Sequence, residues 1–488
     1  MTRLSLATLA SSGRTTALSR RGLRPGIVHL GIGAFSRAHT CVFTEDAMAA
    51  TGDLSWGIVA ATQRSRIVAD RLSPQDGLFS ILERGERAAD LRVVGSTLAA
   101  LSGPDRAEEL VSLIGDPGIR VVTLTVTEKG YRLDPVSRRL DLDDPEIRAD
   151  LAGRMPQTVI GQLARGLQRR ARTADGAPLS VVSCDNLPRN GAIVARAVAD
   201  FVAALPSIEA TRIAEFVDNR VTFPSTMVDR MVPATTSADL DEVEHLLGLR
   251  DEAAVVAEPY RQWVIEDAFA GERPRWELAG AQLVGDVAPW EAAKLQLLNA
   301  THSLLAYLGL AAGMTTIAEA ARDDAFVTAA RRLMYDDVLP VLDLPAELDG
   351  TAYCESILTR VANPALGHTT AKVASDGSQK IGPRLLSTAQ AARRAGREPR
   401  WVGLAVAAWL WRVSNCSASD LNDPLASELV SRLGSARRPD AVVESLLDYD
   451  RVVDPAIAAD DGFVGSVRDW YRLLHDHGPE ALQRAITR

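Results

Sequence analysis

Short apolar runs alternate with helical segments through the first half of the chain, and this alternation most limits the possible folds. Several runs are continuously apolar, as expected of strands covered on both faces in a parallel sheet. The candidate strands are residues 26–32, 56–62, 91–96, 119–128 and 179–186. Helical sequence separates or follows them, for example at 156–170 and 191–205. The pattern predicts an α/β fold.

The second half of the chain differs in character. From about Pro289 onward, long segments rich in Ala, Leu and Arg dominate, and convincing strand patterns disappear. A chain of 488 residues is too long for one small core, so we expect two domains. We place the boundary near residue 285, with an α/β domain over 1–285 and a mostly α-helical domain over 286–488.

The charge balance argues against nucleic acid as a partner. The chain has 63 acidic and 54 basic residues and a net charge of −9, whereas a nucleic-acid surface needs clustered positive charge. A membrane span is not expected either, because no run of roughly eighteen apolar residues occurs.

Two features concern the cellular compartment. The cysteines are widely spaced without a C-x-x-C pair, which is typical of reduced thiols in a cytoplasmic protein; they are Cys41, Cys184, Cys354 and Cys416. Residues 1–26 are rich in Arg and Ser and free of acids, as in a transit peptide. No continuous apolar region or small-residue cleavage site follows, which favours a mobile or edge-binding start of a cytoplasmic protein.

A glycine turn, "IVHLGIGAFSRAH", joins the first predicted strand to the next helix, with Gly31 and Gly33 in the turn and Ala34 and Phe35 after it. A strand, a G-x-G turn and a helix N-terminus form the pyrophosphate site of a Rossmann-type dinucleotide-binding domain. Ser36 stands where the usual third glycine would be, and a merely tight turn would give the same pattern. Its place after the first strand of an α/β alternation favours dinucleotide binding.

The end of the second predicted strand reads Thr62, Gln63, Arg64, Ser65. NAD-binding proteins usually have an acid here for the ribose hydroxyls. Arg64 with Ser65 suits the 2′-phosphate of NADP, and equally suits a solvated loop. The choice between NAD and NADP stays open on these residues.

The chain has only four lysines, at positions 129, 294, 372 and 380, and fifty arginines. Lys294 lies in the apolar segment "EAAKLQLLNATHSLLAYLGL". On an α-helix at about 100° per residue, Glu291, Lys294, Asn299 and His302 fall in one sector, at roughly 60°, 0°, 140° and 80°. The leucines at 297, 304 and 308 fall on the opposite side. A solvated surface helix would show a similar stripe, but this segment is otherwise too apolar for a fully wet face.

Lysine can do chemistry that arginine cannot, because burial can bring its pKa toward neutrality while Arg stays charged. A Lys base beside an amide donor suits oxidation of an alcohol. The amine takes the hydroxyl proton, the amide holds the developing alkoxide, and hydride leaves carbon for nicotinamide.

These residues resemble a known family. "KLQLLNATH" matches the K-x-x-x-x-N-x-x-H signature of the mannitol dehydrogenase family, the polyol-specific long-chain dehydrogenases. Further blocks agree in order over residues 25–475: "GIGAFSRAH", "TVTEKGY", "SCDNLPRNG", "FPSTMVDR", "EPYRQWVIEDAF" and "DGSQK". The resemblance implies a Rossmann-type N-terminal domain, a helical C-terminal domain and a substrate cleft between them.

The resemblance also implies roles for individual residues. Lys294 would be the general base, and Asn186 with Asn299 would bind the oxyanion. His302 would hold a substrate hydroxyl, and Glu291 would pass the proton from Lys294 toward solvent. Asp229 and Lys380 would line the substrate or cofactor cleft. NAD is the expected cofactor with NADP left open, no metal is expected, and the protein would be a monomer or small homo-oligomer.

Within the family, the blocks "TEKGY", "TMVDRMVPATT", "YRQWVIED" and "DGSQK" are more similar to fructuronate reductases than to mannitol 2-dehydrogenases, which tend to read "TEGGY". Lys372 stands where mannitol enzymes often carry Arg, and it is a cation available for a substrate carboxylate or for a hydroxyl. The resemblance therefore implies reduction of D-fructuronate to D-mannonate and the reverse oxidation. Mannitol 2-dehydrogenase is the alternative. A non-catalytic dinucleotide-sensing relative is a remote one, because such a protein would have lost Lys294 or Asn299.

Overall fold

The computed structural model describes residues 2–85, 89–135, 137–172 and 176–488. The chain folds as two compact units, Met1–Ala288 and Pro289–Arg488. Of the N-terminal segment, Met1 lies outside the described residues. Its neighbours are tied to a strand-like edge, because the Leu4 N–H donates to the Arg250 carbonyl at 2.8 Å and the Arg250 N–H donates to the Thr2 carbonyl at 2.9 Å.

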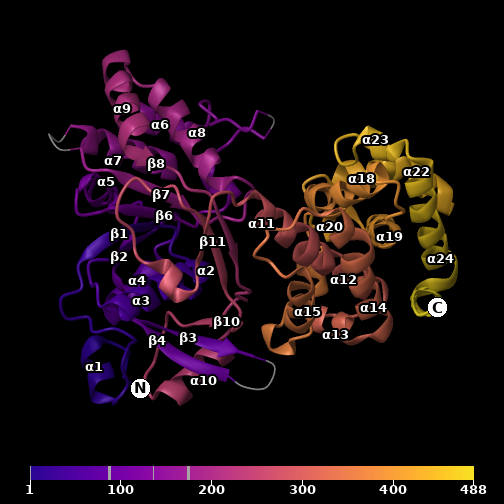
Figure 1. The fold of residues 1–488 in the computed structure, drawn as a ribbon, viewed down its shortest axis with the longest axis horizontal. Coiled ribbons are helices and arrows are strands. Elements are labelled where there is room, and N and C mark those ends of the chain that lie inside the picture. Colours follow the sequence, from indigo (N-terminus) through magenta and orange to yellow (C-terminus); the bar gives the residue numbers. More distant parts are fainter. Residues whose placement is uncertain (1, 86–88, 136, 173–175) are drawn as a thin grey trace. The chain divides into compact units, whose positions relative to one another are not determined.

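A six-stranded parallel sheet forms the centre of the first unit (Figure 1). Its strands, in spatial order, are β5 (Thr97–Ser102), β2 (Gly57–Thr62), β1 (Pro25–Leu30), β6 (Val121–Leu124), β7 (Leu179–Ser183) and β8 (Val221–Thr222). All five pairings are parallel. This order, with the reversal between β1 and β6, is that of the Rossmann dinucleotide-binding fold. The predicted α/β class is confirmed.

Helices cover both faces of this sheet, because alternate strand residues pack into two different cores. Ile27, Ile58 and Val121 belong to one core, and their neighbours Val28, Val59 and Val122 belong to the other. The first core includes α3 (Thr40–Thr51) and α4 (Ile67–Leu72), and the second includes α5 (Ala107–Gly115), α7 (Val159–Ala171), α8 (Asn190–Ala203) and α9 (Ser207–Arg220). Side chains that point to opposite faces are thus all buried, which explains the continuously apolar runs.

The predicted strand at 91–96 belongs to a different sheet. It forms β4 (Ala89–Val94), which pairs antiparallel with β3 (Phe79–Arg84), and β10 (Val255–Ala257) completes this three-stranded sheet. The strand beside β2 is instead β5, whose sequence "TLAALS" was not predicted. It is an edge strand rich in Ala and Leu, and Thr97 is its one β-branched residue among the β-branched and aromatic types that usually mark strands.

The predicted strand at 119–128 is shorter than expected. β6 ends at Leu124, and Thr127 adopts a φ of 68°, which takes the chain out of the sheet. A third sheet was also not predicted and contains β12 (Gln282–Val284), β11 (Gln262–Glu266) and β9 (Thr226–Asp229) in that order. The remaining helices of the first unit are α1 (Leu6–Ser11), α2 (Ala34–Ala38), α6 (Pro145–Leu151) and α10 (Ser237–Leu247).

The second unit is helical, as predicted, and contains no strand among the residues that the structure describes. Its central helix, α19 (Arg400–Ser414), is buried over most of its length and packs on α12 (Ala300–Ala311) and α24 (Asp461–Ile486). Around them lie α11 (Ala288–Ala293), α13 (Ile317–Arg322), α14 (Asp324–Arg332), α15 (Gly350–Val361), α16 (Thr370–Val373), α17 (Gly377–Ile381), α18 (Ser387–Arg394), α20 (Ala418–Leu421), α21 (Ala426–Leu433), α22 (Pro439–Leu447) and α23 (Pro455–Ala458).

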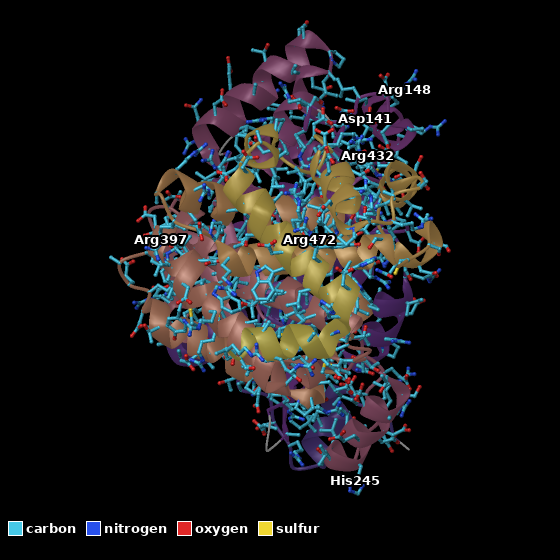
Figure 2. The ribbon with its side chains drawn as sticks, turned by 90° about the vertical axis from the view of Figure 1, so that its right-hand side faces the viewer. Asp141, Arg148, His245, Arg397, Arg432 and Arg472 are labelled. Atoms are coloured by element: carbon cyan, nitrogen blue, oxygen red, sulfur yellow. The ribbon has the colours of Figure 1, made fainter. Side chains whose placement is uncertain are left out.

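The outer surface of the second unit is charged. Arg472 on α24 makes two hydrogen bonds of 2.8 Å each to the Asp440 carboxylate on α22, and Figure 2 labels it on this surface. None of the described helices is both long enough and apolar enough to cross a membrane.

Candidate active site

Gly31 brings three strand ends together. It follows β1 with a φ of 98°, a left-handed conformation that favours glycine. A Cβ atom at this position would lie 2.2 Å from the Thr125 carbonyl oxygen after β6. The Gly31 N–H donates to the Ala61 carbonyl in β2 at 2.8 Å. Only glycine permits this close approach of the β1, β2 and β6 backbones.

Gly33, unlike Gly31, is not required by a close approach of neighbouring backbone. It is the N-cap of α2 with extended backbone, and a Cβ atom there would meet nothing closer than 3.8 Å. Ser36, at the position of the missing third glycine, accepts the Gly33 N–H with its hydroxyl at 3.1 Å. The Phe35 ring stacks on the His39 ring with centroids 4.9 Å apart. Ser36 therefore closes the turn that a third glycine would otherwise leave open.

A pocket of about 650 Å³ opens at the carboxyl ends of the parallel strands. Its lining includes Gly31 after β1, Gln63 and Arg64 after β2, Pro104 after β5, and residues 125–127 after β6. Ligands of open α/β sheets bind at this edge, where the strand order reverses, and the volume is that of a small-molecule site. Of the residues predicted to bind the cofactor, Gly31 and Arg64 line this pocket, while Gly33, Ala34 and Phe35 are not among its lining residues.

Gln63 also lines the pocket, although it was not among the residues predicted to bind the cofactor. Both polar atoms of its side-chain amide are buried without a hydrogen-bond partner among the described residues. Arg64 beside it is exposed and forms no ion pair within the described part of the chain. The carboxylate in the lining, Glu146, pairs with Arg132. The polar groups here thus fit the ribose and phosphate of a dinucleotide, with an amide and a guanidinium in place of the usual acid.

Asp185 fixes the loop after β6. Its buried carboxylate accepts the N–H groups of Val126 at 3.1 Å and Thr127 at 2.7 Å, and the Tyr131 hydroxyl at 2.5 Å. Burial raises the pKa of Asp185, and these hydrogen bonds oppose that shift. The carboxylate connects the blocks "TVTEKGY" and "SCDN", and it sets the backbone from which Asn186 projects as an exposed residue. In the sequence, the one indication of this role for Asp185 is its position next to Asn186 in the block "SCDN".

The segment that carries Lys294 and Asn299 is not one continuous α-helix, contrary to the prediction for residues 291–310. α11 ends at Ala293, residues Lys294–Asn299 form a π-helical turn, and α12 begins at Ala300. The Ala300 N–H donates to the Leu295 carbonyl, five residues back. Such π-turns are rare and frequent at functional sites.

The π-turn changes the geometry of the polar stripe. Residues five apart are stacked in a π-turn as residues four apart are in an α-helix, so Lys294 and Asn299 lie closer around the axis than an α-helix allows. Both are half-buried, as are Glu291 and His302. The leucines on the other side, Leu297, Leu304 and Leu308, are fully buried.

A second histidine lies beside the stripe. The ring centroids of His302 and His368 are 6.4 Å apart. Burial lowers the pKa of His368, and so does the nearby charge of Lys372. Lys372 is exposed on α16, whose N-terminus is capped by Thr369. The structure thus brings together the predicted His302 and Lys372 with His368, which the sequence analysis missed.

Lys380 bonds to the chain segment just before it, residues 373–376. Its ammonium donates to the Ser375 carbonyl at 2.5 Å and the Val373 carbonyl at 3.3 Å, and lies 3.8 Å from the Asp376 carboxylate. Burial lowers its pKa, and the charge of Arg384 does so as well. In the first unit, Asp229 ends β9 as a buried carboxylate.

Comparison with known proteins decides the family. The model of the mannitol dehydrogenase Rossmann domain matches residues 25–278, and that of the mannitol dehydrogenase C-terminal domain matches residues 286–474. The chain belongs to the mannitol dehydrogenase family. It is an oxidoreductase that acts on CH–OH groups with a nicotinamide cofactor, as the resemblance implied.

The similarity to related proteins extends over almost the whole length of this chain. D-mannonate oxidoreductase of Escherichia coli is 36% identical, over 95% of this chain and 96% of that protein. The uncharacterized oxidoreductase YeiQ of the same organism is 36% identical over 100% of both chains. Among solved structures, the ternary complex of Pseudomonas fluorescens mannitol 2-dehydrogenase with NAD and D-mannitol has a TM-score of 0.84 and 32% identity, covering 99% of each chain. The protein is accordingly a polyol or sugar-acid dehydrogenase.

Proposed function

We propose that the protein reduces D-fructuronate to D-mannonate with NADH and catalyses the reverse oxidation with NAD. Relatives that act on a sugar acid and on mannitol are both similar to this chain, so the choice rests on its own residues. The observation that carries it is Lys372, an exposed cation grouped with His302 and His368 on the second unit. A substrate carboxylate needs such a cation, because charge-assisted hydrogen bonds are the strong ones.

The roles proposed for the other residues follow the chemistry of alcohol oxidation. A bound nicotinamide accepts or supplies the hydride. Lys294 takes the hydroxyl proton, and Glu291, one turn earlier, passes it on to solvent. Asn299 and Asn186 donate hydrogen bonds to the oxygen as negative charge develops. His302 holds a neighbouring hydroxyl, and Asp229 and Lys380 remain predicted contacts of substrate or cofactor.

The substrate class is tested by Lys372→Met. A charge-assisted hydrogen bond is worth about 1.5–3 kcal/mol, so the variant should lose about 10–150-fold in kcat/KM for fructuronate. Fructose has no carboxylate and should lose much less. Lys372→Arg retains the cation and is the matched control, with most of the fructuronate activity kept.

The activities on fructuronate and on fructose, assayed with NADH, decide between a fructuronate reductase and a mannitol 2-dehydrogenase. Equal losses on fructuronate and fructose would mean that Lys372 binds hydroxyls. A wild-type preference for fructose would replace the proposal by mannitol 2-dehydrogenase. Binding of NADH without turnover on fructuronate, tagaturonate or fructose would favour a dinucleotide-sensing protein.

The role of Arg64 is tested by the ratio of NADP to NAD activity. As an exposed guanidinium in the pocket lining, Arg64 can pair with a 2′-phosphate, which NAD lacks. Arg64→Ala should therefore lower kcat/KM for NADPH by about 10–150-fold, the value of one charge-assisted contact, and that for NADH far less. Arg66, which pairs with Asp70 and Asp105, provides the control, and Arg66→Ala should leave the ratio unchanged. An unchanged ratio in Arg64→Ala would make Arg64 a solvated loop residue.

A further inference from the structure

Arg384 reaches across to the helix that carries Asn299. It lies in another π-helical segment, Gly382–Leu386, which follows α17. Its guanidinium donates to the backbone carbonyl of Asn299 at 3.3 Å and to the Ser303 hydroxyl at 3.0 Å. The Tyr307 hydroxyl lies near enough to interact electrostatically with this guanidinium. Asn299, Ser303 and Tyr307 follow one another at intervals of four residues. They therefore lie on one face of the helix that runs from the end of the π-turn into α12, and the guanidinium lies along this face.

This contact is charged and partly buried. Burial lowers the pKa of Arg384, while Tyr307 and the Asp376 carboxylate raise it. If the Asn299 carbonyl shifted, the partly buried guanidinium would lose an acceptor, and an unsatisfied donor costs free energy. The contact therefore restrains the backbone at Asn299, the last residue of the π-turn.

A second link joins the π-turn to α18, the helix that follows the segment of Arg384. The Thr388 hydroxyl on α18 donates to the Gln296 side-chain oxygen at 2.9 Å. Gln296 lies in the middle of the π-turn, whereas Arg384 holds its end. The turn that carries Lys294 and Asn299 is thus fastened to residues 382–388 at two points, and only the Arg384 link bonds directly to one of the two proposed catalytic residues.

We propose that Arg384 is a positioning residue that sets the side chain of Asn299 through its backbone carbonyl. The inference rests on the role proposed for Asn299 as a donor to the alkoxide. A donor contributes only if it points at the place where charge develops, and a displacement of about 1 Å can cost on the order of 10²-fold in rate. Arg384 supplies that precision without touching substrate.

The test begins with Arg384→Met, which keeps an unbranched apolar stem and removes the charge and the donors. We expect kcat to fall by roughly 10- to 100-fold, with KM for NADH unchanged because the pocket lining lies in the first unit. Thr388→Val removes the other link from a fully buried side chain that bonds to neither proposed catalytic residue. The lost hydrogen bond should cost about 1 kcal/mol of stability, and kcat should fall far less than in Arg384→Met. Arg384→Lys keeps a positive charge and N–H donors but loses the planar fork of the guanidinium, so it should recover part of the loss.

A double-mutant cycle separates positioning from a general weakening of the fold. If Arg384 acts through Asn299, Arg384→Met should cost little more once Asn299 is already Ala, because coupled residues are non-additive. Full additivity in the cycle, or a wild-type kcat in Arg384→Met, would overturn the proposal. A wild-type kcat in Asn299→Ala would instead remove the proposed role of Asn299 itself.

If Arg384→Met does not fold, Arg384→Lys enters the same cycle and gives the same decision. Thermal unfolding of each variant reports the structural cost. A loss of kcat in Arg384→Lys that disappears in the Asn299→Ala background supports positioning. A loss that persists there contradicts it.

Discussion

Replacement of Lys294 by alanine should lower kcat by about 10²–10⁴-fold, the contribution of a positioned general base. Affinity for NADH should change little, because Lys294 belongs to the second unit and the candidate dinucleotide pocket is lined by residues of the first. The half-buried position of Lys294 at the start of a π-turn suits an amine that gains and loses a proton.

Two controls make this result specific. Lys294→Arg keeps the positive charge but cannot act as a base, since a guanidinium stays protonated, so it should be as inactive as the alanine variant. Small primary amines added to Lys294→Ala should restore part of the turnover, and they should do nothing for Lys294→Arg. The measurement is kcat in both directions with NADH affinity followed by fluorescence. Near wild-type turnover in Lys294→Ala, or recovery in Lys294→Arg, would show that another group takes the proton.

The sequence predicted the central strands of the sheet because those strands are covered on both faces. Apolar residues dominate β1, β2, β6 and β7, and every residue of these strands except Pro25 is buried. An apolar run identifies a strand but not its neighbour, so the strand at 91–96 was assigned to the wrong sheet. β5 was missed because an Ala-rich edge strand has little composition to distinguish it.

The candidate site was predictable where chemistry depends on residue type. Lys294, Asn299 and His302 were found from their side chains and spacing, but the π-turn between them was not, because helical periodicity over a short segment does not reveal one wider turn. The supporting residues have no signature of their own. Asp185, His368 and Arg384 act through backbone carbonyls, N–H groups and neighbouring rings, and such partners are known only once the chain is folded.

The oxyanion donors give the second large effect. Asn186→Ala and Asn299→Ala should each reduce kcat by about 10²–10³-fold, the usual loss for one such donor. KM for the keto-sugar should rise far less, because a neutral carbonyl gains less from the amide than the alkoxide does. If KM alone changed while kcat held, both amides would be ground-state contacts.

Aspartate variants and a neighbouring asparagine sharpen this test. Asn299→Asp keeps the shape of the side chain but places a negative charge beside the developing alkoxide, so it should lose at least as much as Asn299→Ala. A residue with a purely structural role would instead tolerate the isosteric change better than truncation. For Asn186, the control is Asn190, whose side chain donates to the carbonyls of Asp185 and Thr226 at 2.9 Å each. Asn190→Ala should lower the temperature of unfolding through these lost bonds, whereas Asn186→Ala should lower kcat at nearly unchanged stability. An Asn186→Ala variant that loses stability while keeping its turnover would place Asn186 with Asn190 as a structural residue.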